Sequence, residues 1–322
     1  MKKIVCVCLS LLFLLLPLSA GAVPLSAGDD ALRASFGAGS AGGLDFRFFE
    51  PQTQEGKTYP LVVWLHGIAS GNYAGDQVDS YDFCKWASDE YQARFSAGGA
   101  YLLCPRCPGG WEVLAPSGLK NCIDGFMSQH PGKIDAGRIY VIGFSVGAVM
   151  VIRTVAAYPD YFAAAIPVSA VTQLQPNVEK MDRTAVWFFA NDRDAYVGAN
   201  SAATRSSYNT LKGRIADADK LRFTWVTSAV YPDYGNVATQ HYMWRIVTND
   251  YFMNDNAPYA NATTLDGSGA VVSFTYPEGV ISWLNRQSRP AAQPGSGQSM
   301  SFLSRIIAFF RNLFAAIARL FS

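Results

Sequence analysis

The sequence lacks an excess of charge of either sign. It contains 26 Lys and Arg against 25 Asp and Glu, which gives a formal net charge of +1 over 322 residues. Proteins that bind nucleic acid neutralise phosphates with clustered Lys and Arg. The balance therefore argues against nucleic acid as a partner. The length of 322 residues allows one large α/β domain or two smaller ones, and the hydrophobic share of 50% is enough for a sizeable core.

Long apolar runs are scarce as well. The clearest one, Ile4 to Leu16, follows Lys2 and Lys3 and precedes small residues that end at Ala22. It is too short and wrongly flanked for a spanning helix, and this pattern predicts a secretory signal peptide over residues 1–22. Its removal takes the Lys and Arg count from 26 to 24, against 25 Asp and Glu. We expect the mature protein to be secreted or periplasmic, with or without attachment to a surface.

Cysteine is also sparse, and two of the six cysteines lie inside the predicted signal. The mature chain keeps Cys84, Cys104, Cys107 and Cys122. An even number in an exported chain predicts two disulfides, although spacing does not give their connectivity. Cys104 and Cys107 form a CxxC pair with neither a second CxxC nor a nearby histidine, so we expect no metal site. No organic cofactor is implied elsewhere in the sequence.

Apolar runs of strand length alternate with helical spacing through most of the chain. The runs cover residues 44–50, 59–67, 100–104, 139–143, 163–169, 185–190 and 221–228, and helical spacing covers 81–95 and 117–128. Such alternation predicts an α/β fold with a doubly wound, mostly parallel sheet and helices on both faces. We assign residues 23–43 to a leader and 44–290 to one catalytic domain.

The segment after this domain has a different composition. Residues 291–300 are rich in Pro, Gly and Ser and predict a flexible linker. Residues 301–322 place Phe, Ile and Leu on one side and arginines on the other, which is typical of a basic amphipathic helix. Two interpretations remain: the helix docks on its own domain, or it contacts a membrane surface or an insoluble substrate.

The motif GFSVGA, Gly143 to Ala148, lies between an apolar strand pattern and a helical one. In a G-x-S-x-G turn from strand to helix, the two glycines allow close backbone approach and the central residue is strained, so that its hydroxyl is raised above the sheet. This context predicts that Ser145 is a nucleophile. A serine hydroxyl also needs a general base, usually histidine, and an acid that orients the base.

Only three histidines are available for that role. His66 follows a strand in LHG and is expected to support its loop by hydrogen bonding. His130 precedes Pro131 at a helix end, a usual place for a solvated or capping side chain. Elimination and chain order leave His241, after the last of these predicted strands, as the base.

The acid and the oxyanion donors are expected at the carboxyl ends of strands, where loops of a parallel sheet meet. Asp192 and Asp194 follow one buried strand, and either could be the acid or could cap a turn. Attack on an ester carbonyl creates an oxyanion that backbone N–H groups must bind. Val146, after the nucleophile, and Ile68, beside Gly67, are the expected donors.

The block KIDAGRIYVIGFSVGAVMVIRTVAAYPDYFAAAIPVSA resembles the secreted α/β-hydrolases grouped with polyhydroxybutyrate depolymerases, feruloyl esterases and predicted peptidases. PLVVWLHG, YLLCPRCPGGW, VWFFANDRDAYV and YPDYG are similar to further blocks of that family in the same order, over residues 45–290. The resemblance implies an α/β-hydrolase fold, with Ser145 as nucleophile and Asp194, three residues before Val197, as acid. The order Ser145, Asp194, His241 matches that fold's arrangement.

The sequence departs from the family pattern near the acid and the base. It has Ala190 and Asn191 where His-Gly is usual, and Asn236 where the family histidine commonly stands, so His241 lies five positions later. A third departure is Ala148, where the family usually has a second glycine after the serine motif.

These observations predict a serine hydrolase that cleaves carboxylic esters, with a feruloyl or acetyl ester, a short acyl ester or a polyester as substrate. A catalytically inactive surface-binding protein of the same fold and a serine peptidase are the alternatives, because fold alone does not secure activity. Several tryptophans could line an acyl or phenolic pocket, although such residues more often fill a core: Trp64, Trp111, Trp187, Trp225 and Trp244.

Overall fold

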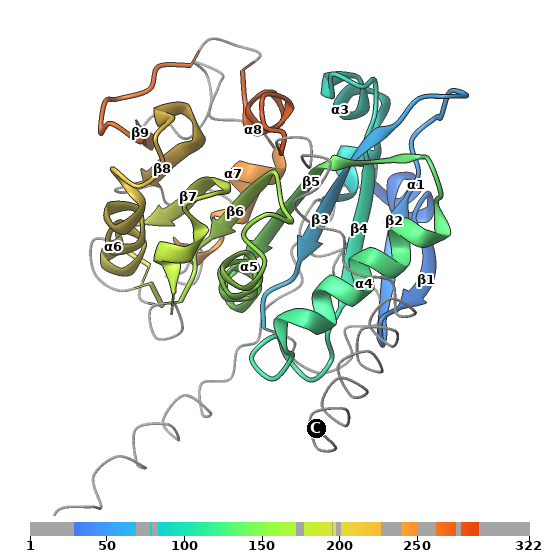
Figure 1. Cartoon of the computed structure of the whole chain (residues 1–322), viewed down its shortest axis with the longest axis horizontal. Coiled ribbons are helices and arrows are strands. Elements are labelled where there is room, and N and C mark those ends of the chain that lie inside the picture. Colours follow the sequence, from blue (N-terminus) through green and yellow to red (C-terminus); the bar gives the residue numbers. More distant parts are fainter. Residues whose placement is uncertain are drawn as a thin grey trace, which may run out of the picture.

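The computed structural model describes residues 29–68, 78, 83–171, 177–194, 196–197, 201–226, 240–249, 262–274 and 278–289. Within them one sheet of nine strands has the order β1-β2-β4-β3-β5-β6-β7-β8-β9 (Figure 1). The strands are β1 (Gly37–Ala41), β2 (Leu44–Phe49), β3 (Tyr59–Leu65), β4 (Tyr101–Arg106), β5 (Ile134–Phe144), β6 (Ala164–Val168), β7 (Ala185–Asn191), β8 (Leu221–Val226) and β9 (Ala262–Asp266).

The centre of the sheet is parallel and its edges are antiparallel. Strands β3 to β8 pair in parallel, whereas β1 with β2, β2 with β4, and β8 with β9 pair antiparallel. Every residue of β3, β6 and β7 is buried, because a parallel strand between two helical layers has no face in water. The predicted mostly parallel sheet is therefore confirmed.

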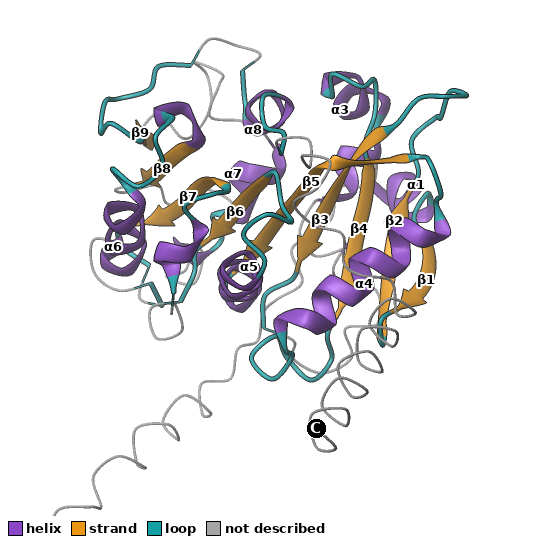
Figure 2. Ribbon diagram, viewed as in Figure 1, coloured by secondary structure: helices purple, strands orange, loops and turns teal. Residues whose placement is uncertain are grey.

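Helices cover both faces of the sheet (Figure 2). One face packs on α1 (Asp29–Ala34), η1 (Phe83–Ala87), α3 (Asp89–Arg94), α7 (Trp244–Asn249) and α8 (Val280–Asn285). The other packs on α4 (Pro116–Gln129), α5 (Val146–Ala157), η3 (Val178–Met181) and α6 (Ala202–Leu211). The short η5 (Ala218–Lys220) leads into β8.

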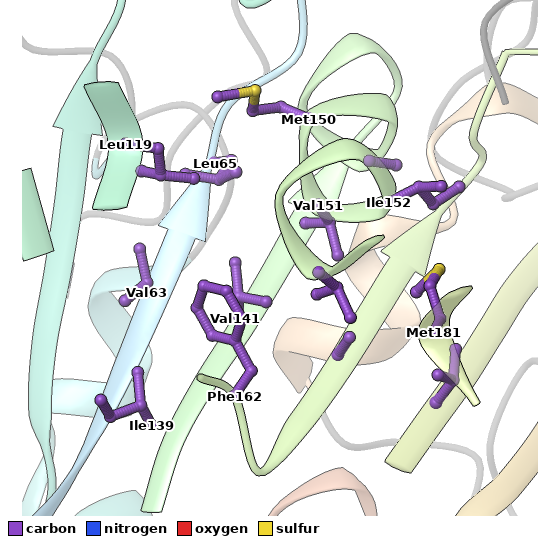
Figure 3. Packing of buried hydrophobic residues seen from close by; sticks show 14 of the residues in the cluster. Val63, Leu65, Leu119, Ile139, Val141, Met150, Val151, Ile152, Phe162 and Met181 are labelled. Carbon is purple, nitrogen blue, oxygen red and sulfur yellow. The ribbon is translucent and has the colours of Figure 1, made fainter. Parts of the chain in front are cut away.

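The two cores arise from alternation along each strand. In β3, Val62 and Trp64 point into one cluster, while Val63 and Leu65 point into the other. Helix α5 is buried at every position from Val146 to Val155 except Arg153, so it lies directly on the sheet. Figure 3 shows its side chains against those of β3 and β5. This packing fixes the start of α5 relative to the ends of both strands.

The structure corrects several sequence-based expectations. The sheet begins at Gly37 rather than at 44, because part of the expected leader pairs as β1 with β2. The expected helix over 81–95 is broken at Ser88, which is extended at ψ 152° and caps α3 by accepting from the N–H of Tyr91. The tryptophans, by contrast, follow the expectation that such residues more often fill a core: four of the five named above do so, and Trp225 is half-buried.

The two expected disulfides are not confirmed: Cys84, Cys104, Cys107 and Cys122 are buried, and no disulfide is seen among the described residues. They divide between the two core clusters and act as small apolar side chains there. Burial raises the pKa of Cys122 to about 12, which keeps that thiol protonated.

The predicted signal peptide, the linker and the C-terminal amphipathic helix lie outside the described residues. Among the helices that are described, none has the length and apolar character needed to cross a membrane.

Candidate active site

The parallel strands β3, β5, β6 and β7 all end at the same edge of the sheet, where a doubly wound fold gathers its functional groups. His66 follows β3, Ser145 follows β5, and Asp192 and Asp194 follow β7. His241 comes from the short turn before α7. Four segments distant in sequence thus supply the residues singled out above.

Ser145 occupies a strained turn between β5 and α5. Its φ of 57° and ψ of −118° lie in a region that costs a non-glycine residue about 1–3 kcal/mol. Its N–H donates to the carbonyl of Val168, at the end of β6, at 2.9 Å. The neighbouring strand therefore holds the backbone in a conformation that the residue alone would not adopt.

The two glycines of the motif are required by close backbone contacts. A Cβ at Gly143 would lie 2.5 Å from the carbonyl oxygen of Gly147. A Cβ at Gly147 would lie 2.6 Å from the carbonyl oxygen of Leu65 and would also collide with that of His66. The turn at Ser145 is thus pressed against the end of β3, which brings the chain near Ile68 toward the start of α5.

Two backbone N–H groups at this junction are candidates for binding an oxyanion. Val146 is the first residue of α5, and the N–H groups of a first turn have no partner within their helix. Ile68 lies just after β3, and the residue is 57% exposed. The positive end of the α5 dipole also favours negative charge at this place.

His66 fixes the peptide that carries the Ile68 N–H. The Cys107 N–H donates to His66 Nε2 at 3.1 Å, so the ring proton is on Nδ1 and is donated to the Gly67 carbonyl at 2.7 Å. The C=O and N–H of one trans peptide point in opposite directions, so this bond also directs the Ile68 N–H. Burial lowers the pKa of His66 from 6.5 to about 4, so the ring is neutral near pH 7. Its expected loop-supporting role is confirmed.

The loop after β4 completes this support. The indole of Trp111 donates to the His66 carbonyl at 2.9 Å, and its ring centroid lies 4.9 Å from that of His66. Arg153 of α5 donates to the carbonyls of Trp111 at 2.9 Å and Leu114 at 3.2 Å. The end of β3, the loop after β4 and α5 are therefore bonded into one unit.

Asp194 and His241 form a buried pair. His241 Nδ1 lies 2.6 Å from Asp194 Oδ2, and the two residues are 8% and 2% exposed. The other oxygen, Oδ1, accepts from the Tyr196 N–H at 2.9 Å. The rings of Phe144 and Tyr196 lie 4.8 and 4.9 Å from the His241 ring. With Nδ1 on the carboxylate, Nε2 is the nitrogen left to act on another group.

Asp192 has different partners. Its Oδ1 accepts from the Ser201 hydroxyl at 2.7 Å and from Arg205 at 3.0 Å. Asp192 therefore connects the loop after β7 to α6. Of the two carboxylates, Asp194 is the one that contacts His241.

Phe144, the residue before Ser145, packs its ring on the His241 imidazole. Within the described ranges no hydrogen bond joins the Ser145 hydroxyl to His241. Catalytic hydrogen bonds of this type are often long without substrate and tighten in the complex. The third histidine, His130, caps α4 and bonds to the Phe126 carbonyl and Glu50, as its position predicts.

Sequence reasoning missed a second contact beside the acid and the histidine. Asn191 Nδ2 donates to Gln240 Oε1 at 2.9 Å, and both side chains are buried. The signal available was the amide at Asn191, where the family pattern usually has glycine. Within the described part of the chain, no group of three or more His, Cys, Asp and Glu side chains could hold a metal ion.

Comparisons with known proteins agree with this architecture. An alignment of 149 positions is 36% identical to poly(3-hydroxyalkanoate) depolymerase C of Paucimonas lemoignei and covers 38% of this chain and 33% of that protein. An alignment of 170 positions is 26% identical to feruloyl esterase B of Thermothelomyces thermophilus and covers 43% of this chain and 53% of that protein. The matches thus span less than two thirds of either relative. No family model matches the chain.

A solved structure described as a thermostable esterase superposes with a TM-score of 0.59 at 23% identity, over 80% of this chain and 64% of that one. The chain has the α/β-hydrolase fold. The resemblance to α/β-hydrolases of the depolymerase and feruloyl esterase type is likewise confirmed, since both kinds of enzyme are among its relatives.

Proposed function

We propose that this α/β-hydrolase is a secreted serine hydrolase that cleaves carboxylic esters through an acyl-enzyme. The observation that carries the proposal is the buried 2.6 Å contact between Asp194 and His241, at the edge where Ser145 sits on its strained turn. Secretion is supported by the signal-peptide pattern of residues 1–22.

In the first step Ser145 Oγ forms a bond to the acyl carbon while His241 Nε2 takes the hydroxyl proton. The bond to the alcohol then breaks, and His241 returns the proton to the leaving oxygen. Water attacks the acyl-serine by the same proton route, which releases the acid and restores Ser145. Asp194 holds the ring with its proton on Nδ1 and stabilises the imidazolium that forms in each step.

The oxyanion of each tetrahedral intermediate is bound by the N–H groups of Val146 and Ile68. The first is supported by its place at the start of α5, and the second by the peptide orientation that His66 imposes. Donors that are already oriented lose little free energy in reorganisation when charge develops, so they stabilise the transition state more than the ground state.

The substrate class rests on the relatives. One is named a depolymerase of poly(3-hydroxyalkanoate) and the other a feruloyl esterase. Both names describe carboxylic esters, so we expect a feruloyl, acetyl, short acyl or polyester substrate here. The proposed steps use side chains and backbone groups of this chain and route no step through a metal or an organic cofactor.

The test compares hydrolysis of a chromogenic short-chain ester by the mature wild-type chain and by Ser145→Ala, His241→Ala and Asp194→Asn. We expect each substitution to lower kcat by about 10⁴-fold or more, because triad members act as a unit. Circular dichroism and Tm of each variant establish that the fold is intact.

Asp192→Asn is the matched control, since it makes the same change two residues away on a carboxylate bonded to Ser201 and Arg205. It should retain nearly full turnover. Unchanged turnover in Ser145→Ala or His241→Ala would remove that residue from the mechanism. Absence of wild-type turnover on a broad ester panel would favour a binding protein, and turnover of peptides alone would favour a peptidase.

A further inference from the structure

The amide pair of Asn191 and Gln240 lies beside the acid and the histidine. Asn191 is the last residue of β7 and is 0% exposed, and Gln240, directly before His241, is 6% exposed. Asn191 Nδ2 donates to Gln240 Oε1 at 2.9 Å. A buried amide–amide bond between residues this far apart in sequence joins two segments that backbone hydrogen bonds do not pair within the described residues.

Asn191 also shapes the turn that presents the acid. Its Oδ1 accepts from the Arg193 N–H at 2.9 Å, and its carbonyl accepts from the Asp194 N–H at 3.0 Å. Because the Arg193 N–H needs an acceptor, the Asn191 side chain must place its oxygen toward Arg193 and its nitrogen toward Gln240. Gln240 must then place its own side-chain oxygen toward Asn191. Each amide orientation therefore follows from the network.

Two bonds thus connect the same two segments. In the turn after β7, the Asn191 side chain is hydrogen-bonded to Gln240 and the Asp194 side chain to His241. A single hydrogen bond leaves the imidazole free to swing about it, whereas a second anchor on the preceding residue restricts that motion. The amide pair is neutral, so it adds this restriction without placing another charge beside Asp194.

We propose that Asn191 and Gln240 are positioning residues for His241, which hold Nδ1 on Asp194 and keep Nε2 turned toward Ser145. The inference rests on the proposed function of His241 as the general base. Small displacements of a catalytic group cost large factors in rate, because the reacting atoms must be nearly in contact and aligned. Loss of the Asn191 contact should therefore lower kcat more than it changes KM.

The experiment uses Gln240→Met, which keeps the side-chain length and removes the acceptor. The matched control is Gln92→Met, since Gln92 is also buried and bonds through both ends of its amide, to the Trp86 carbonyl and the Ala100 N–H. We expect both variants to lower Tm. Only Gln240→Met should lower kcat, by roughly 10- to 100-fold with KM nearly unchanged.

A second measurement follows the imidazole itself. The chain has only three histidines, so ¹⁵N resonances of the rings can be assigned by single substitutions. In the wild type His241 should show the tautomer with its proton on Nδ1, and in Gln240→Met a mixture of tautomers. Gln92→Met should leave the wild-type spectrum of His241 unchanged.

The two readouts separate this inference from the proposed function. Equal kcat in Gln240→Met and Gln92→Met, with an unchanged His241 spectrum, would overturn the positioning role even if the enzyme is an active esterase. If the wild type hydrolyses no ester, the spectrum decides alone: a changed tautomer in Gln240→Met supports positioning, and an unchanged one overturns it.

Discussion

At the scale of single residues, the site depends on side chains whose chemical state is set by their surroundings. His66 is the clearest case, because its two ring nitrogens have different tasks: one accepts from Cys107 and the other donates to Gly67. A protonated ring could not accept, so the contact with Cys107 would be lost. The neutral form is therefore part of the folded structure.

This predicts a specific dependence of stability on pH. The pKa of His66 is about 4 in the folded protein against 6.5 as its ordinary value, because burial disfavours the charged ring. The unfolded chain binds more protons between these values, so the contribution of His66 is complete above pH 6.5 and declines as the pH falls toward 4. We expect this group to lower the free energy of unfolding by about 2 kcal/mol between pH 7 and pH 5.

Urea denaturation at pH 7 and pH 5 measures the effect. His66→Gln should be less stable than wild type at pH 7 and should lose less stability on acidification. His130→Gln changes a partly exposed histidine and leaves His66 in place. Its free energy of unfolding should therefore fall between pH 7 and pH 5 as much as that of the wild type. Parallel losses in wild type and His66→Gln would contradict the prediction.

The strained turn at Ser145 could be predicted from sequence because its geometry is local. A serine between glycines at a change from strand to helix requires one kind of turn. The choice between Asp192 and Asp194 could not be made from the residues alone, since both follow the same strand. It depended on family resemblance, and of the two aspartates Asp194 is the one that contacts His241 in the structure. The contact between Asn191 and Gln240 could not be predicted from sequence, because no local pattern indicates a partner so distant along the chain.

At the scale of elements, the site is formed where β3 and α5 meet. The carbonyls of Leu65 and His66 are in contact with Gly147, and this contact sets the separation of the two proposed oxyanion donors. Backbone atoms cannot move aside as the end of a flexible side chain can. The spacing of the site thus depends on the absence of a single methyl group.

We therefore expect Gly147→Ala to force β3 and α5 apart. Overpacking of this kind costs about 1–3 kcal/mol of stability, or more where only backbone can yield. Ester turnover should fall sharply, because both N–H donors move. Thermal unfolding and kcat are the measurements. Gly109→Ala is the control, since its Cβ would meet only Val113 at 3.6 Å, an ordinary contact; equal behaviour of the two variants would contradict the prediction.

The central elements could be predicted because buried parallel strands leave continuous apolar runs. The edge strand β1 could not, because its sequence GAGSA carries no such run. Its glycines are needed instead for contact with the rings of β2: a Cβ at Gly39 would lie 2.7 Å from Phe46, and one at Gly37 would lie 2.9 Å from Phe48. The sheet extends to β1 through backbone pairing and the small size of the β1 residues. Hydrophobic periodicity detects neither feature.

At the scale of the whole molecule, the proposed chemistry occupies one edge of a sheet that is covered on both faces. The arginine-bearing segment 301–322 lies outside the described residues and follows the predicted linker in sequence. The residues proposed to bind and cleave an ester all come from positions before 242. Attachment to a surface and hydrolysis of a soluble ester should therefore be separable.

Deletion of residues 292–322 should reduce binding to anionic lipid vesicles or to an insoluble polyester and leave kcat for a soluble ester unchanged, because a basic amphipathic helix binds surfaces through apolar area and charge. Cosedimentation and ester hydrolysis measure the two effects. Reversing the charges at Arg305, Arg311 and Arg319 in the full chain separates the contributions, since it should weaken binding to anionic vesicles more than to polyester. Equal binding by full-length and truncated chains would instead favour a helix that docks on its own domain. Lower turnover of the soluble ester after truncation would show that this docking supports the site.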